Sequence, residues 1–169
     1  RLAEIIGPTA YRVRITTFHG FCNQVIQLMP EAFPHIMGGS SIHEADQIAL
    51  IEKCIDSGSF QLIRPFGNRM AWARPALRAI NDLKREGITP EQFRSILEAE
   101  ERSFAQIPDL YHEKGKYKGK MKGAYLQQQN DIARNVELAS VYEQYQEALR
   151  ADQAYDYNDM ILEVLRAME

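Results

Sequence analysis

The sequence is poor in the features that mark secreted and membrane-spanning proteins. It has only two cysteines, Cys22 and Cys54, and both fall on apolar faces of expected helices. Two reduced core cysteines, rather than a disulfide, are typical of a cytosolic protein. No apolar run approaches the roughly 20 residues that a membrane-spanning helix needs. We therefore expect a cytoplasmic protein that makes no contact with a membrane.

The sequence also lacks the motif that holds nucleotide phosphates, Gly-x-x-x-x-Gly-Lys-Ser/Thr. The nearest segment, which begins at Gly115, has the wrong glycine spacing and no hydroxyl residue after Lys120. An Asp-Glu-x-x-Asp motif, which would hold Mg²⁺, is absent as well. We therefore expect this chain to contain no site for ATP or for Mg²⁺ and no catalytic residues.

Charge is distributed unevenly along the chain. The net charge is -3, and residues 113–122 carry five lysines and one glutamate, or +4, which leaves -7 for the remainder. An acidic protein with one compact basic segment is typical of a local anion contact, not of a wholly basic DNA-coating protein. In an extended segment the alternating lysines would all point to one side. The five are Lys114, Lys116, Lys118, Lys120 and Lys122.

Two interpretations of these lysines remain open. A solvated charge run is the common outcome for such a segment. The interspersed glycines and Tyr117 favour a loop that binds phosphates.

Helical periodicity dominates the rest of the sequence and predicts an all-α fold, a bundle of five or six main helices. Alternating apolar and polar residues predict at most a short isolated strand near residues 12–16. Ser41 with Glu44, and Thr89 with Gln92, have the spacing of capping boxes at helix starts. A helix of about 28 residues is expected from near Gly123 to Ala151.

The last expected helix begins at an acidic pair. Asp156 and Asp159 could be proposed as an acid pair or as metal ligands. Their spacing fits an N-cap and the third helical position better, and we interpret them so.

The junction at residues 17–19 joins the expected strand to a helix. Thr17 can cap that helix, whose free N–H groups and positive end attract anions. Phe18 shares a helix face with Phe21 and Cys22, which favours a core position over base stacking. His19 and Cys22 have the spacing of some zinc ligands, but no second pair lies nearby, and we expect no metal site.

The residues Thr17-Phe18-His19-Gly20-Phe21 resemble the TFH motif of superfamily 1 helicases of the UvrD/Rep/PcrA group. Three further regions resemble parts of the same family in the same order. Residues 1–7 resemble the helix tail after the preceding DNA-contact motif, and residues 82–90 resemble the mid-insert helix and turn. Residues 142–146 with 155–160 resemble the region that leads to the Walker B motif.

The resemblance implies an ATP-dependent DNA helicase, 3′-to-5′ in polarity, in which parts outside this sequence hold ATP and Mg²⁺. It implies that residues 1–17 are a flanking piece of the first motor domain, made of a helix tail and a strand. Residues 18–169 would form the inserted 1B subdomain, whose last helix, 157–168, leads back to the motor domain. The partners would be DNA, as single strand and duplex junction, and the motor domains of the parent chain.

The resemblance also implies roles for single residues. Thr17, Phe18 and His19 would contact single-stranded DNA, and the five lysines would contact phosphates of the duplex. Without the resemblance, His19 would be read as a solvated histidine on a polar stripe. Two alternatives remain: the equivalent segment of a RecB/AddA-like helicase–nuclease, and an all-helical protein–protein interaction module.

The absence of phosphate and Mg²⁺ ligands gives a first prediction. The purified chain should show no DNA-stimulated ATP hydrolysis, because it has no group to hold the phosphates or to neutralise the developing charge. Phosphate release measured with and without single-stranded DNA would check this. Turnover that a substitution within the chain abolishes would contradict it.

Overall fold

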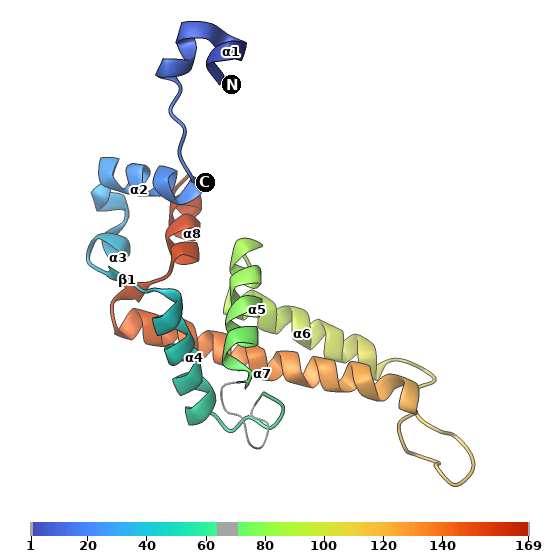
Figure 1. Cartoon of the computed structure of the whole chain (residues 1–169). Coiled ribbons are helices and arrows are strands. Elements are labelled where there is room, and N and C mark those ends of the chain that lie inside the picture. Colours follow the sequence, from blue (N-terminus) through green and yellow to red (C-terminus); the bar gives the residue numbers. More distant parts are fainter. Residues whose placement is uncertain (1, 64–70, 169) are drawn as a thin grey trace.

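The structure is a computed structural model that describes residues 2–63 and 71–168. Six long helices account for most of these residues, as the all-α expectation predicted (Figure 1). They are α2 (Phe18–Leu28), α4 (Glu44–Ser57), α5 (Ala73–Arg85), α6 (Pro90–Ala105), α7 (Gly123–Ala151) and α8 (Tyr157–Ala167). In the described part of the chain, no helix has the length and apolar character needed to cross a membrane.

Short elements connect these helices. They are α1 (Leu2–Ile6), the 3₁₀ helices η1 (Gly7–Arg12) and η2 (Pro30–Ala32), α3 (Pro34–Met37), β1 (Ser40–Ser41) and β2 (Ala154–Tyr155). The strands β1 and β2 pair in parallel, with Ser40 opposite Ala154. This small sheet joins the first quarter of the chain to its last helix.

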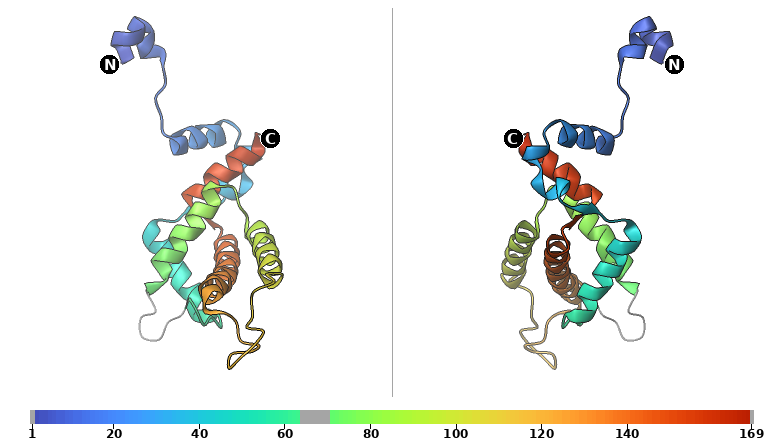
Figure 2. Two further views of the ribbon diagram at one scale, coloured as in Figure 1. Left: turned by 90° about the vertical axis from the view of Figure 1, so that its right-hand side faces the viewer. Right: turned by 90° about the vertical axis from the view of Figure 1, so that its left-hand side faces the viewer.

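No strand forms over residues 12–16, where alternation had suggested one. Arg12 ends η1, and the chain from Val13 to Thr17 is extended without a partner strand in the described residues. A strand needs a neighbour for its backbone groups, and an isolated one leaves them to water. Figures 1 and 2 show α1 and η1 standing away from the body at the end of this extended link.

Three apolar clusters hold the helices together. The largest lies between α4, α5 and α7 and includes Ile51, Ile80 and Val141, all fully buried. A second joins α2 and the η2–α3 segment to α8. The third, around Phe104 and Ile132, joins the far ends of α6 and α7. Both cysteines are free and buried, Cys22 in the second cluster and Cys54 in the first.

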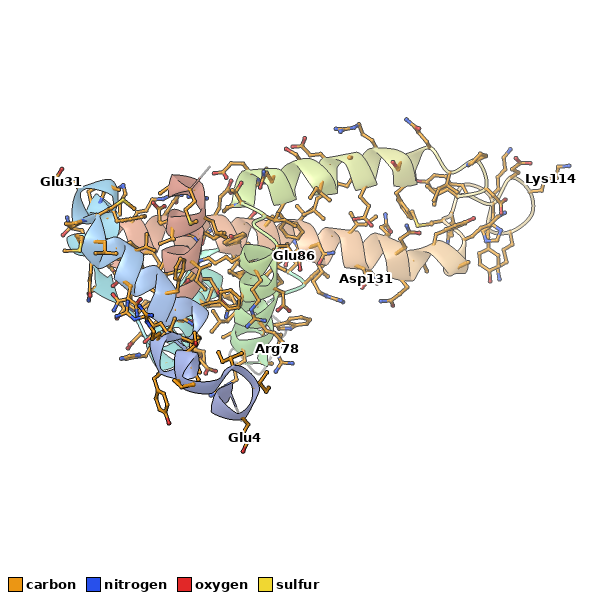
Figure 3. The ribbon with its side chains drawn as sticks, turned by 90° about the horizontal axis from the view of Figure 1, so that it is seen from above. Glu4, Glu31, Arg78, Glu86, Lys114 and Asp131 are labelled. Atoms are coloured by element: carbon orange, nitrogen blue, oxygen red, sulfur yellow. The ribbon has the colours of Figure 1, made fainter. Side chains whose placement is uncertain are left out.

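Helices α6 and α7 form a long antiparallel arm that extends from the body (Figure 3). The 29 residues of α7 correspond to a length of about 43 Å at 1.5 Å per residue. An ion pair between Arg94 and Glu143 ties the two helices near the body. Figure 3 places Lys114 at the far end of the arm. The expectation of one helix from Gly123 to Ala151 is confirmed.

The start of α4 differs from the capping box expected at Ser41 and Glu44. His43 is the N-cap, and its N–H donates to the Asp46 carboxylate at 3.4 Å. Ser41 is in β1, and the N–H of the following residue, Ile42, donates to the carbonyl of Tyr155 at 3.0 Å. The strand pairing therefore moves the helix start two residues along the chain. The box at Thr89 and Gln92 forms as expected.

A buried lysine joins three of the helices. Lys84 on α5 has no exposed surface, and its Nζ donates to Asp156 at 2.6 Å and to Asp159 at 2.7 Å. The hydroxyl of Tyr145 on α7 donates to the same Asp156 oxygen as Lys84, at 2.9 Å. The other Asp156 oxygen accepts the N–H groups of Asn158 and Asp159, so it caps α8 as the sequence predicted.

Charge in this buried group does not balance. One ammonium faces two carboxylates, and burial raises the pKa of Asp159 above its ordinary 3.8, although the Lys84 ammonium opposes the shift. Burial also raises the pKa of the Tyr145 phenol, which therefore remains a hydrogen-bond donor. Removing Lys84 would leave both carboxylates without their counter-charge in a water-poor site.

We predict that Lys84→Met lowers the free energy of unfolding by about 3–5 kcal/mol near neutral pH, because it leaves unpaired buried charge. The loss should shrink as the pH falls. Between the unfolded pKa of Asp159 and its raised folded pKa, the folded state binds more protons, so lower pH favours folding. Urea unfolding at several pH values would measure both effects.

Arg85 provides the matched control, because it is the next residue on α5 and its ion pair with Asp82 is largely exposed. Arg85→Met should change stability by no more than about 0.5 kcal/mol. Equal losses for the two substitutions would contradict a special role for the buried pair.

Candidate nucleic-acid interface

The first candidate contact lies at the start of α2. The Thr17 hydroxyl accepts the Gly20 N–H at 3.1 Å, and the Thr17 carbonyl accepts the Phe21 N–H at 2.9 Å. Thr17 is therefore the N-cap, as the sequence predicted. The N–H groups of Phe18 and His19 have no hydrogen-bond partner among the described residues, which is usual for the first turn of a helix. The helix start can accept an anion.

Phe18 is not a core residue, so the preference for a buried position was wrong. Its side chain is 83% exposed. The apolar face of α2 becomes buried only one turn later, where Cys22 and Ile26 join Met160 and Val164 of α8. Phe18 precedes this contact surface, and its ring is left free at the tip.

His19 is exposed and contacts one ring of α8. Its imidazole lies edge to face against Tyr157, with 5.1 Å between ring centroids and an interplanar angle of 81°. Tyr157 is the first residue of α8 and is 46% exposed. The start of α2 therefore presents a hydroxyl, two unpaired N–H groups, an exposed phenyl ring and an imidazole.

The second candidate contact is the turn at the end of the α6–α7 arm. Tyr111 and Met121 form an antiparallel bridge, and the chain between them doubles back. The His112 N–H donates to the Lys120 carbonyl at 3.0 Å, and the Gly119 N–H donates to the His112 carbonyl at 2.8 Å. Leu110 is buried in the third apolar cluster and fixes the base of this turn to the arm.

The lysines at this tip are not arranged as an extended segment would arrange them. Gly115 and Gly119 have positive φ angles of 83° and 78°, a conformation that side chains disfavour. They turn the chain back on itself, so the segment is not extended and the alternation of the five lysines does not place them all on one side.

The five lysines also differ in their surroundings. Lys122 forms an ion pair with Asp109, and Lys120 lies 5.9 Å from the centroid of the Tyr117 ring. Lys114, Lys116 and Lys118 are exposed and form no ion pair within the described residues. The free positive charge of the tip therefore lies mainly on these three side chains.

The two candidate contacts lie at separate ends of the molecule. In Figure 1 α2 is at the upper left, next to α8, while the 113–122 turn is at the lower right, beyond the end of the arm. The chain between them runs through α3, α4, α5 and α6, while α7 leads back from the turn to α8, which packs on α2. A single ligand would need to be extended to reach both.

A cavity of about 500 Å³ opens between α3, the start of α6, α7 and α8. Its lining includes Glu91, Arg150 and Asp159, so both signs of charge are present. This mixture does not form an anion site. Within the described ranges, no group of three or more His, Cys, Asp or Glu side chains could hold a metal ion.

Sequence reasoning missed two residues that shape these surfaces. Lys84 occupies a core position, and its spacing from Leu77 and Ile80 would have placed it on their helix face. Tyr157 is the second of these residues, and its contact with His19 was not foreseen. No local pattern links residues 19 and 157, because only the packing of α2 on α8 brings them together.

Comparison with known proteins gives a family for the whole chain. A model of the UvrD/REP helicase N-terminal domain matches residues 1–169. The chain is 24% identical over 169 residues to the ATP-dependent DNA helicase UvrD1 of Mycobacterium bovis and to that of Mycobacterium tuberculosis. These matches cover 100% of this chain but 17% of each relative. No solved structure matches it significantly. The chain thus belongs to the family of the UvrD/REP helicase N-terminal domain.

Proposed function

We propose that this chain is a DNA-binding accessory subdomain of an ATP-dependent DNA helicase, the inserted 1B subdomain. The parent would be a 3′-to-5′ motor that holds ATP and Mg²⁺ in domains beyond this segment. The observation that carries the proposal is the basic turn at the tip of the α6–α7 arm, on a chain that is otherwise acidic. The family of the chain and its similarity to UvrD1, an ATP-dependent DNA helicase, support the same proposal.

The tip would contact duplex phosphates. Lys114, Lys116 and Lys118 are exposed and are not held in ion pairs within the described residues, and Figure 3 shows Lys114 at the far end of the α6–α7 arm. An ammonium that has no protein partner releases counterions when it meets a phosphate, which favours binding. Lys122 is engaged with Asp109, so its contribution would be smaller.

The start of α2 would contact single-stranded DNA. The Thr17 hydroxyl accepts the Gly20 N–H and can still donate its own proton to a phosphate oxygen. The imidazole N–H of His19, beside the Thr17 hydroxyl, can donate a second hydrogen bond to the phosphate. The exposed ring of Phe18 suits stacking on a base, which is sequence-tolerant because every base has a π-face.

Two features support an attachment to motor domains. Helices α1 and η1 stand apart from the body in Figure 2, as expected of a flank that belongs to a neighbouring domain. Large apolar side chains on and around α2 are exposed, namely Phe21, Leu28, Met29 and Met37. Exposed apolar side chains on neighbouring elements are what an interface with another domain would cover. The motor domain of the parent would cover them.

The basic tip gives a salt-dependence prediction. Replacing Lys114, Lys116 and Lys118 by alanine should weaken duplex DNA binding and reduce the log–log salt slope by about 2 to 3, since each phosphate contact contributes roughly 0.9. All duplex sequences should be affected alike, because phosphate contacts carry no sequence information. Fluorescence anisotropy across several salt concentrations would measure the slope.

The matched control removes three exposed positive charges elsewhere, at Lys53, Arg78 and Arg85. It changes the net charge by the same amount and should leave the slope nearly unaltered. If the wild type and the tip variant have equal salt slopes for duplex DNA binding, the proposed contact of the tip with DNA is wrong. A chain that binds no DNA at all would favour the protein-interaction module instead.

The start of α2 gives a separate prediction. His19→Ala should weaken single-stranded DNA binding about tenfold, in the range expected for loss of a hydrogen bond to a charged group. His35→Ala is the control, because His35 is an exposed histidine on α3. Stability should not change in either variant. If both bind single-stranded DNA as the wild type does, the α2 contact is wrong while the tip contact can still stand.

A further inference from the structure

Tyr157 is the described residue whose ring contacts His19. The two rings meet edge to face at 5.1 Å, within the range of favourable aromatic pairs. His19 is otherwise exposed, so the tyrosine ring limits the orientations that the imidazole can adopt. The Tyr157 hydroxyl makes no hydrogen bond within the described part of the chain, so the contact depends on the ring alone.

The backbone of Tyr157 is fixed from both sides. Asp156, which precedes it, binds Lys84 of α5 at 2.6 Å and Tyr145 of α7 at 2.9 Å. Asn158, which follows it, donates its side-chain amide to Asn81 of α5 at 2.8 Å. A residue held between two such anchors presents its ring in one place.

The contact also joins helices from opposite ends of the sequence. α2 packs along α8 through Cys22 and Ile26 on one side and Met160 and Val164 on the other. The His19–Tyr157 pair lies at the first turn of both helices, beyond these apolar contacts. It is the part of the α2–α8 contact that reaches the candidate single-strand surface.

We propose that Tyr157 is a positioning residue for His19 in the single-strand contact. It holds the imidazole so that its N–H points toward the DNA backbone rather than rotating freely in water. The inference rests on the proposed function, since it assumes that His19 contacts DNA. Its consequence is that the buried Lys84–Asp156 pair helps to set the geometry of a DNA contact on the surface.

The test compares Tyr157→Ala with Tyr157→Phe. Alanine removes the ring and should weaken single-stranded DNA binding about two- to tenfold, the range that an aromatic pair spans. Phenylalanine keeps the ring and should bind as the wild type does. Leu165→Ala, an exposed change farther along α8, should also bind as the wild type does. Circular dichroism melts would verify that all variants fold.

An NMR measurement distinguishes the positioning of the His19 ring by Tyr157 from an effect of Tyr157 on the stability of the fold. The imidazole carbon-bound protons of His19, followed by NMR in the free chain, should shift in Tyr157→Ala because the neighbouring ring current is lost. They should stay in place in Tyr157→Phe and in Leu165→Ala. Unchanged His19 signals in Tyr157→Ala would overturn the inference.

A double-mutant cycle separates positioning from a direct contact of Tyr157 with DNA. If Tyr157 acts through His19, Tyr157→Ala should have no further effect on binding once His19 is alanine. Additive losses would mean that the tyrosine contacts DNA itself, and would overturn the positioning role.

The proposed function can fail separately from this inference. If His19→Ala weakens binding and Tyr157→Ala does not, only the inference is wrong. If His19→Ala leaves binding unchanged, the single-strand contact proposed for α2 fails, and the positioning role fails with it.

Discussion

The ion pair between Lys84 and the two aspartates at the start of α8 is the interaction on which the arrangement of this molecule depends. It joins α5 to α8 and, through the Tyr145 hydroxyl, to α7. Helices α5 and α7 share the first apolar cluster and α8 belongs to the second, so the buried charges link these two clusters. Removing such a pair of charges from water costs free energy, so the pair contributes more by fixing one geometry than by adding net stability. That geometry sets where α8 begins, and with it where Tyr157 meets His19.

The remainder of the molecule consists of packed helices and two exposed ends, the tip of the α6–α7 arm and the start of α2. The arm of α6 and α7 carries its basic turn far from the body, with Leu110 in the small cluster that fixes the turn to the arm. The start of α2 is the other end, with Phe18 and His19 outside the packed part of the helix. Each end is attached to a packed helix, and its outermost side chains, such as Phe18 and Lys114, are exposed. This is the division expected when a scaffold presents contacts to a large, extended ligand.

The helices were predictable because their apolar periodicity is strong. The spacing of Ile132, Ala139 and Tyr142 on α7, and the box at Thr89, depend only on local sequence, and the structure bears them out. The failures have tertiary causes. The pairing of β1 with β2 moved the start of α4 along the chain. The packing of α2 on α8 begins only at Cys22, which leaves Phe18 exposed. Two positive-φ glycines turn the lysine segment, so its alternating lysines do not share the one side that an extended segment would give them.

The candidate site was predictable in part. The residue types at positions 17–19 and the charge of the tip could be read from the sequence. Their surroundings could not, because Lys84 is buried by residues about 70 positions away and Tyr157 reaches His19 only through helix packing.

The parallel pair of β1 and β2 also bears on how the chain is made. It brings residues 40 and 154 together, and the cluster that buries Cys22, Ile26 and Phe33 is completed only by Met160 and Val164. During synthesis from the N-terminus, α2 and α3 leave the ribosome long before α8 exists. The contacts between α6 and α7 are nearer in sequence, so the arm can form before α8 covers the apolar face of α2 and α3. Long-range closure is slow because its entropy cost precedes its contacts. The last helix therefore acts as the closing step of folding, and the apolar side chains of α2 remain in water until it arrives.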